Sequence, residues 1–349
     1  MEESYQHGGD IYRNDVLYDF SVNTNPFGMP QKSVKAAVKG ISLAKCYPDS
    51  QADALREEIA NKKQLLKEQI LVGNGAAELI YGLCQAIQPQ KVLTVSPCFQ
   101  EYEEAVCSCN GEMQFWNLKE ENNFSLEETF IKKITEDIDL VFLCNPNNPT
   151  GQLISRQLLE KIAKRCEEMK VWFCLDECFL PFLKEEASYS MLSSICDFPH
   201  LMILRAFTKI YGMAGLRLGY GISSNGKLRE KIQRVIQPWN TSIPAQMAGV
   251  EALKDDAYLL MTRQLIERET QYLMREMQKG LAEKIYEPSV NYIFFKARKD
   301  LKERLLEKKI LIRSCDNYHN LCRGFFRIAV REREENQALI RAWRDLERK

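Results

Sequence analysis

Short apolar runs alternate with amphipathic stretches through the middle of the chain. The apolar runs predict strands at residues 91–95, 140–144, 171–175, 201–204 and 218–222, and the amphipathic stretches predict helices at 77–87, 156–170 and 227–235. Strands that alternate with helices indicate βαβ units, so we predict an α/β fold with a mostly parallel sheet flanked by helices. Sheets of this kind bind ligands at the carboxyl ends of their strands.

The pattern changes at about residue 255. A long helical stretch, 257–277, is followed by shorter elements of both kinds. They are predicted strands at 291–296, 310–313 and 325–330 and predicted helices at 301–308 and 334–347. This mixture indicates a second, smaller α+β unit. We therefore predict a large domain, residues 30–255, and a small domain, residues 1–29 and 256–349, which includes an N-terminal arm.

Composition narrows the range of functions. The 349 residues include 48 basic and 48 acidic side chains, so the formal net charge is zero. A nucleic-acid-binding protein usually has a basic excess or stripe, and this chain has neither, so no nucleic-acid partner is expected. No apolar run reaches membrane-spanning length, and the N-terminus, Met-Glu-Glu-Ser, has acidic residues where a signal peptide has basic ones. We expect a cytoplasmic protein that does not bind membranes.

Twelve cysteines are scattered along the chain, and no Cys-x-x-Cys motif occurs. Several of them, such as Cys84, Cys144 and Cys174, lie inside apolar runs, where cysteine packs as a small apolar residue. The histidines are His7, His200 and His319. We interpret the cysteines as reduced thiols of a cytosolic core and expect no metal site.

The most informative segment is residues 208–219, Thr-Lys-Ile-Tyr-Gly-Met-Ala-Gly-Leu-Arg-Leu-Gly, which follows a predicted strand. Its lysine, Lys209, lies between two apolar runs. Burial disfavours the charged ammonium group, so we expect the pKa of Lys209 to be low and the neutral amine to be available. A neutral amine attacks an aldehyde to form a Schiff base. Taken alone, the segment is better explained by a surface lysine in a glycine-rich loop.

Three further motifs favour a cofactor site. Residues 73–78, Gly-Asn-Gly-Ala-Ala-Glu, open a predicted helix, where glycines and free N–H groups can accommodate a phosphate. Asp176 and Glu177 end a predicted strand, and a carboxylate there can pair with a pyridinium nitrogen. Residues 145–151, Asn-Pro-Asn-Asn-Pro-Thr-Gly, form a rigid turn that can direct an amide toward a ligand. Each motif by itself also fits a simple turn, a helix cap or a tight loop.

In this order and spacing, the four motifs resemble those of the fold-type I aminotransferases of classes I and II, which bind pyridoxal 5′-phosphate (PLP). The resemblance implies a large and a small domain of the fold-type I PLP-transferase kind. It also implies that Lys209 forms the Schiff base with PLP. Asp176 matches the partner of the pyridine nitrogen, and Asn148 matches the donor to the ring hydroxyl.

The same resemblance implies further contacts with the cofactor. The implied cofactor-binding residues are Gly75, Ala76, Ala77, Phe99, Thr208, Arg217 and Tyr47. The backbone of residues 75–77 and the side chain of Arg217 would hold the phosphate, and Phe99 would stack on the ring. Tyr47 matches a tyrosine that reaches the cofactor phosphate of the neighbouring subunit, so the resemblance implies a homodimer.

Within this family, two groups of enzymes share the core motifs. The core motifs also resemble those of histidinol-phosphate aminotransferases. Both ends of the chain resemble the threonine-phosphate decarboxylases of cobamide synthesis, in the N-terminal segments 7–10 and 19–26 and the C-terminal segments 310–318 and 326–331. Phe179 replaces the ring-hydroxyl tyrosine of many aminotransferases, which favours the decarboxylases. The phosphate loop has two alanines in place of a serine or threonine, so backbone donors and Arg217 must supply more of the binding.

The reaction depends on which Cα bond stands perpendicular to the ring, and so on where anionic groups of the substrate are held. Arg313, Arg327 and the arm residue His7 are the predicted substrate contacts, because guanidinium groups suit phosphate and carboxylate. The first hypothesis is decarboxylation of L-threonine O-phosphate or L-serine O-phosphate, and the second is transamination of histidinol phosphate. A third, a non-catalytic protein of the same fold, is disfavoured by the intact Lys209 and Arg217.

Overall fold

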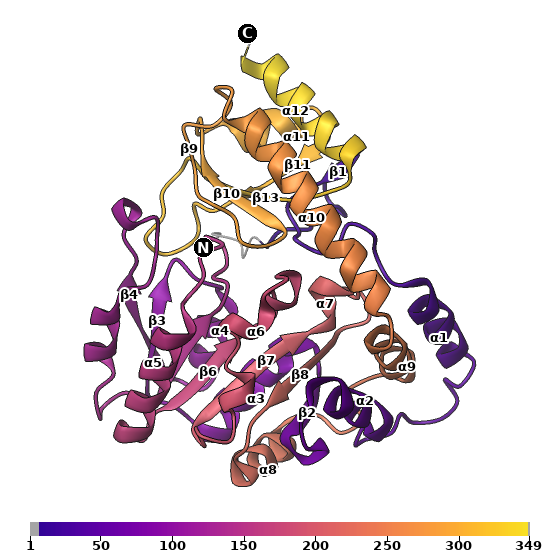
Figure 1. Ribbon diagram of the computed structural model, residues 1–349, viewed down its shortest axis with the longest axis vertical. Coiled ribbons are helices and arrows are strands. Elements are labelled where there is room, and N and C mark those ends of the chain that lie inside the picture. Colours follow the sequence, from indigo (N-terminus) through magenta and orange to yellow (C-terminus); the bar gives the residue numbers. More distant parts are fainter. Residues whose placement is uncertain (1–6, 348–349) are drawn as a thin grey trace.

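A seven-stranded sheet forms the centre of the computed structural model, which describes residues 7–347 (Figure 1). Its strands are β2 (Ile70–Asn74), β3 (Lys91–Ser96), β4 (Glu112–Asn117), β5 (Leu140–Cys144), β6 (Trp172–Asp176), β7 (Leu201–Ala206) and β8 (Leu218–Ile222). They lie in the order β2-β8-β7-β6-β5-β3-β4. The strand β8 runs antiparallel to both of its neighbours, and the remaining adjacent pairs are parallel. The predicted mostly parallel sheet is confirmed.

Helices flank this sheet. The helices of the first 255 residues are α1 (Gln31–Ile41), α2 (Asp53–Lys63), α3 (Gly75–Ile87), α4 (Glu101–Cys107), α5 (Arg156–Met169), α6 (Glu186–Tyr189), α7 (Phe207–Ile210), α8 (Gly226–Val235) and α9 (Ile243–Leu253). Short 3₁₀ turns occupy Lys67–Gln69, Glu120–Asn122, Glu128–Lys133, Leu180–Phe182 and Leu192–Ser194. Every residue of β5 and β7 is buried, which requires cover on both faces of the sheet and explains why these strands read as continuous apolar runs.

The C-terminal part of the chain forms a second, smaller sheet. It begins with the long helix α10 (Asp256–Met277), which Figure 1 shows running from the region of the large sheet to the small one. The later elements are β9 (Lys284–Ile285), β10 (Tyr292–Lys296), α11 (Leu301–Leu306), β11 (Ile310–Leu311), β12 (Arg313–Ser314), β13 (Phe325–Ala329) and α12 (Arg333–Glu347). Four of these strands pair in the order β12-β13-β10-β9.

The N-terminal arm contacts the C-terminal part. Its short strand β1 (Tyr18–Asp19) pairs in parallel with β11, and the amide of Ala329 donates to the carbonyl of Phe20. The domain boundaries at residues 30 and 255 remain predictions.

The predicted elements differ from the observed ones at several places. The predicted strand 310–313 is two short strands that belong to different sheets, because β11 pairs with β1 and β12 pairs with β13. The predicted helix 301–308 ends at Leu306, and Lys309 has the left-handed φ of +60° that follows many helix ends. The sequence pattern did not predict β2, β4, α1, α2 or α9. For β4 the reason is exposure, since no residue of this edge strand is fully buried and the apolar run is correspondingly weak.

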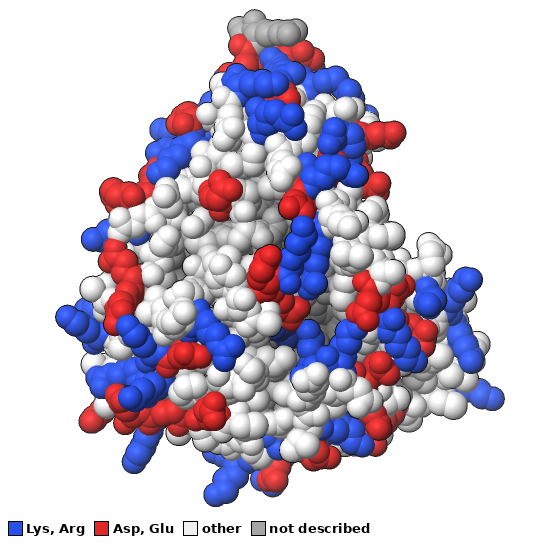
Figure 2. Space-filling model, in the orientation of Figure 1, with Lys and Arg blue, Asp and Glu red and all other residues white. Residues whose placement is uncertain are grey.

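Charges of both signs are mixed on the face that Figure 2 shows. Lysines and arginines lie among aspartates and glutamates around its periphery, and uncharged residues occupy much of its centre. Within residues 7–347, no helix is long and apolar enough to cross a membrane. The same residues contain no group of three or more His, Cys, Asp or Glu side chains arranged to hold a metal ion.

Candidate active site

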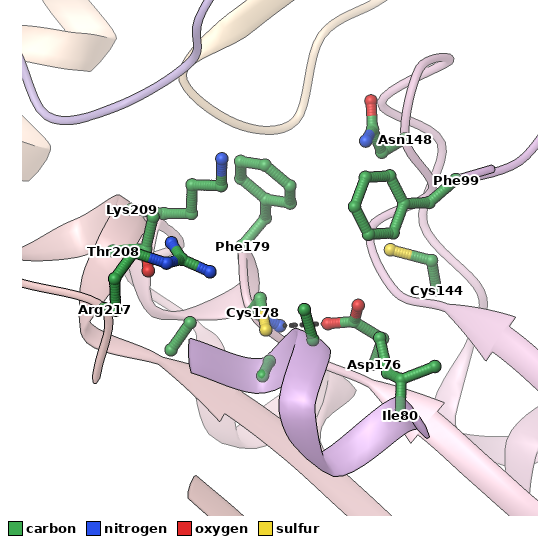
Figure 3. A pocket seen from close by; sticks show the side chains of 13 residues that line it. Ile80, Phe99, Cys144, Asn148, Asp176, Cys178, Phe179, Thr208, Lys209 and Arg217 are labelled. Carbon is green, nitrogen blue, oxygen red and sulfur yellow. Dashed lines mark hydrogen bonds between the residues drawn. The ribbon is translucent and has the colours of Figure 1, made fainter. Parts of the chain in front are cut away.

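One pocket at the carboxyl ends of the central strands collects most of the predicted cofactor residues (Figure 3). Asp176 is the last residue of β6, Lys209 lies just beyond β7, and Asn148 lies just beyond β5. Because these three strands are adjacent and parallel, their carboxyl ends meet at one edge of the sheet. The predicted residues that line the pocket are Ala76, Ala77, Phe99, Asn148, Asp176, Thr208, Lys209 and Arg217.

Lys209 extends into this pocket from the one-turn helix α7. Its Nζ lies 5.5 Å from the centroid of the Phe179 ring. Burial, and then the positive charges of Arg327 and Arg217, lower the pKa of Lys209 to about 8. A larger fraction of the amine is therefore neutral at neutral pH than in an ordinary lysine, and the neutral amine is the form that attacks an aldehyde.

Asp176 is buried and accepts two hydrogen bonds. Its Oδ1 accepts from the amide of Cys178 at 2.9 Å, and its Oδ2 accepts from the hydroxyl of Tyr102 at 2.8 Å. The ring of Tyr102 is itself buried and stacks on Phe142 with a centroid distance of 4.8 Å. Burial and then the charge of Asp176 raise the pKa of Tyr102 well above its usual value, so the hydroxyl remains a donor.

Sequence reasoning missed Tyr102. The only available signal was its position on α4, three residues after Phe99, which lines the pocket. That spacing corresponds to about one helical turn, but it does not show which strand the ring would pack against.

The loop before α3 forms a compact cradle with Arg217. Gly75 has a φ of +76°, and a Cβ at this residue would lie 2.6 Å from Nη2 of Arg217. A Cβ at Gly219 would lie 2.4 Å from the amide nitrogen of Ala76. Asn74 makes no side-chain cap, so the first-turn N–H groups of α3 are not occupied by it. A helix start and an adjacent guanidinium group together suit a phosphate.

The two predicted substrate arginines are direct cross-strand neighbours on β12 and β13. Both Arg313 and Arg327 are buried, and like charges in this arrangement repel each other. Arg327 donates to Oδ1 of Asn148 and, at 2.9 Å, to the carbonyl of Ser21. Its buried Nε has no hydrogen-bond partner within residues 7–347. An anion beside the pair would relieve the repulsion and could accept from this donor.

The structure does not place all predicted substrate contacts in the same pocket. Arg327 reaches the first pocket through its bond to Asn148, which belongs to the lining. Arg313 and His7 instead line a second cavity between the N-terminal arm and the strands β11 and β12. His7 also forms an ion pair with Glu101, with 3.1 Å between Nε2 and Oε1. The predicted roles of these residues toward a substrate remain predictions.

Tyr47 lies outside the pocket of its own subunit. Its side chain is exposed and stacks on Trp239 with a centroid distance of 4.5 Å. Its predicted contact with the cofactor of a second subunit is therefore not contradicted, and it stays a prediction.

The pocket fits PLP. The cradle of α3 and Arg217 suits the phosphate, the carboxylate of Asp176 suits the ring nitrogen, and the amine of Lys209 suits the aldehyde. Phe99 contributes a flat wall on the side of the pocket opposite Lys209 in Figure 3. The predicted phosphate, ring-nitrogen and Schiff-base contacts thus have counterparts of the right chemistry at one cavity, and Tyr47 lies outside it.

The fold and this pocket define the class of protein, a fold-type I enzyme that uses PLP. The family model described as aminotransferase class I and II matches residues 15–342, so the chain belongs to this family. The match spans nearly the whole chain and includes all three sheets.

Three similar proteins show how much of this chain is shared with known proteins. The threonine-phosphate decarboxylase of Salmonella typhimurium is 34% identical, over 97% of this chain and 96% of that protein. The adenosylcobalamin biosynthesis bifunctional protein CobDQ of Leptospira interrogans is 29% identical, over 98% of this chain and 41% of that protein. The crystal structure of the histidinol-phosphate aminotransferase of Clostridium acetobutylicum has a TM-score of 0.89 and 32% identity, over 95% of this chain and 99% of that one.

Proposed function

We propose that this PLP-dependent enzyme decarboxylates a small phosphorylated amino acid, L-threonine O-phosphate or a close relative such as L-serine O-phosphate, in cobalamin synthesis. The observation that carries the proposal is the buried Arg327, which reaches the lysine pocket through Asn148 and has the buried Arg313 as its direct cross-strand neighbour. A phosphorylated amino acid has a phosphate and a carboxylate, and two guanidinium groups offer a bidentate partner to each. The similarity to the Salmonella decarboxylase over almost the full length of both chains supports the same substrate.

Each proposed residue has one task in this reaction. PLP, when bound, supplies a protonated ring that accepts the electrons of the bond broken at the substrate Cα. Asp176 would keep the ring nitrogen protonated. Arg313 and Arg327 would hold the substrate so that its Cα–carboxylate bond is the one that breaks. Lys209 Nζ would deliver the proton that replaces the departing carbon dioxide on Cα.

Transamination is the second candidate. The likeness to the Clostridium acetobutylicum aminotransferase favours it, since that structure matches nearly the whole chain. Phe179 argues against it, because the ring beside Lys209 Nζ has no hydroxyl to bond to the cofactor. Both candidates use the same cofactor pocket and differ in how the substrate is oriented.

The deciding experiment gives the purified enzyme L-threonine O-phosphate and measures carbon dioxide and aminopropanol phosphate. We expect the two products in equal amounts and without any added oxo acid. The parallel assay contains histidinol phosphate and 2-oxoglutarate. Formation of glutamate in that assay, with no carbon dioxide in the first, would reassign the enzyme as an aminotransferase.

We also propose a homodimer in the cytoplasm. The helix α1 exposes Val34, Val38 and Ile41 along one face, and Tyr47 is exposed nearby in the sequence, which supports a second subunit covering this region. All twelve cysteines lie within residues 7–347 and are unpaired, which supports a reducing compartment.

A further inference from the structure

The lysine of the pocket is carried by a very short helix. The helix α7 has only four residues, and its last carbonyl groups belong to Lys209 and Ile210. A single helical turn is not stable by itself, and the carbonyls at its end need partners from elsewhere. The contacts that hold this turn in place therefore determine the position of Lys209 Nζ.

Asn25 of the N-terminal arm supplies a partner to each of these carbonyls, and the amide of Gly212 also donates to the carbonyl of Lys209 at 3.3 Å. The backbone N–H of Asn25 donates to the carbonyl of Lys209 at 2.9 Å, and its Nδ2 donates to the carbonyl of Ile210 at 2.7 Å. The same Nδ2 donates to Oγ1 of Thr262 on α10 at 2.8 Å, and Oδ1 accepts from the amide of Phe27 at 3.0 Å. Asn25 is 2% exposed, so water does not compete for these bonds.

Close backbone contact supports the same arrangement. Gly212, directly after the lysine turn, has a φ of +62°, and a Cβ there would lie 2.4 Å from the carbonyl oxygen of Gly28. That carbonyl also accepts from the hydroxyl of Tyr258 on α10. The arm segment 25–28 thus lies directly against the turn 209–212, with α10 on its other side.

We propose that Asn25 is a positioning residue for the cofactor lysine. It holds the turn of Lys209 against α10, which leads to the small sheet. It therefore fixes the amine relative to the cofactor pocket at the large sheet and to the predicted substrate arginines on the small sheet. The inference rests on the proposed role of Lys209 and holds for decarboxylation and transamination alike. A displacement of a reacting group by about 1 Å can cost on the order of a hundredfold in rate, so fixing this turn matters for turnover.

The chain offers a matched control in Asn291. This asparagine is also completely buried, and its Nδ2 donates to the carbonyl of Asn23 at 2.9 Å, in the same arm segment. Its hydrogen bonds go to Asn23 and Thr24 rather than to the lysine turn. The variants Asn25→Ala and Asn291→Ala both remove a buried side-chain amide that holds the arm, but only the first removes a hydrogen bond to the turn that carries Lys209, the one from Nδ2 to the carbonyl of Ile210.

The test compares these two variants as holoenzymes and after removal and return of PLP. We expect both to lower the melting temperature. Only Asn25→Ala should shift the pH midpoint of the cofactor absorption band, slow the covalent labelling of Lys209 by PLP and borohydride, and lower kcat by about ten- to a hundredfold. The KM for L-threonine O-phosphate should change by less than about threefold, because the predicted substrate arginines are not touched.

A milder change covers the case in which Asn25→Ala does not fold. Thr262→Val leaves Asn25 in place and removes one of its acceptors, so it should shift the band midpoint and the labelling rate in the same direction by a smaller amount. The inference would be overturned if Asn25→Ala and Asn291→Ala had equal effects on the pH midpoint of the absorption band, the labelling rate and kcat. It would also be overturned if Thr262→Val left the pH midpoint of the band and the labelling rate unchanged.

Failure of the proposed function has a different signature. If wild-type Lys209 is labelled but L-threonine O-phosphate is not turned over, the substrate assignment is wrong and the labelling rates and band midpoints still decide the role of Asn25. If wild-type Lys209 is not labelled, both the role of the lysine and the inference are wrong.

Discussion

The hydroxyl of Tyr102 provides a single-atom test of the site. The substitution Tyr102→Phe keeps the ring that stacks on Phe142 and removes only the donor to Asp176 Oδ2. One of the two hydrogen bonds that Asp176 accepts is then lost, and the amide of Cys178 remains. Because the site is buried, water does not readily replace the missing donor.

The expected loss follows from the charge on Asp176. A hydrogen bond to a charged group contributes roughly 1.5–3 kcal/mol, so Tyr102→Phe should lower kcat/KM by about ten- to a hundredfold. Without the hydroxyl, the Asp176 carboxylate loses one of the two donors that hold it and is less firmly oriented toward the ring nitrogen of the cofactor. The ring is then a weaker electron acceptor. We expect kcat to carry most of the loss, since neither residue contacts the predicted substrate arginines.

A double-mutant cycle checks that the effect passes through Asp176. Asp176→Asn should cost more than Tyr102→Phe, because a neutral amide cannot keep the ring nitrogen protonated. In the Asp176→Asn enzyme, the further change Tyr102→Phe should have little additional effect on kcat/KM. If Tyr102→Phe alone leaves kcat/KM unchanged, or if the two losses simply multiply, the hydroxyl does not act on this carboxylate.

Other consequences follow from the same site. Because the pKa of Lys209 is lowered to about 8, the amine is mostly protonated below this pH and mostly neutral above it. Labelling of the apoenzyme by PLP should therefore accelerate as the pH rises through about 8. Lys209→Ala should abolish both the labelling and the turnover. Mixtures of inactive Tyr47→Ala and Lys209→Ala subunits should recover some activity through hybrid dimers, whereas an active monomer in sedimentation would contradict a shared site. Arg313→Lys and Arg327→Lys should each lower kcat/KM by roughly ten- to a hundredfold, because an ammonium cannot replace a bidentate guanidinium. An unaltered preference of both variants for L-threonine O-phosphate over L-threonine would remove the phosphorylated substrate from consideration.

The parts of the fold that sequence could predict are those with one strong local signal. The strands β5 and β8 have the predicted bounds, because their residues are buried throughout and stand out as apolar runs between polar turns. Lys209, Asp176 and Asn148 were recognised because each is a polar residue at or just beyond the end of such a run. Their meeting in one pocket follows from the parallel order of three adjacent strands.

Contacts between distant segments could not be predicted from the sequence in this way. Asn25 and Lys209 are separated by more than a hundred and eighty residues, and only the folded chain brings the arm onto the lysine turn. The split of the predicted strand 310–313 has a similar cause, since its two halves choose partners that lie far apart in sequence. Tyr102 was missed because a buried tyrosine on an amphipathic helix is normally a packing residue.

The position of Arg327 connects the substrate with the lysine. Its charge is the largest contribution after burial to the low pKa of Lys209, and its side chain also donates to Asn148 in the cofactor pocket. A phosphate or carboxylate bound at Arg327 would offset this charge and raise the pKa of the nearby lysine, so substrate binding should favour the protonated amine. A decarboxylase needs a proton donor beside Cα once carbon dioxide has left, whereas the first step of transamination needs a base there. The sign of this electrostatic coupling therefore favours decarboxylation.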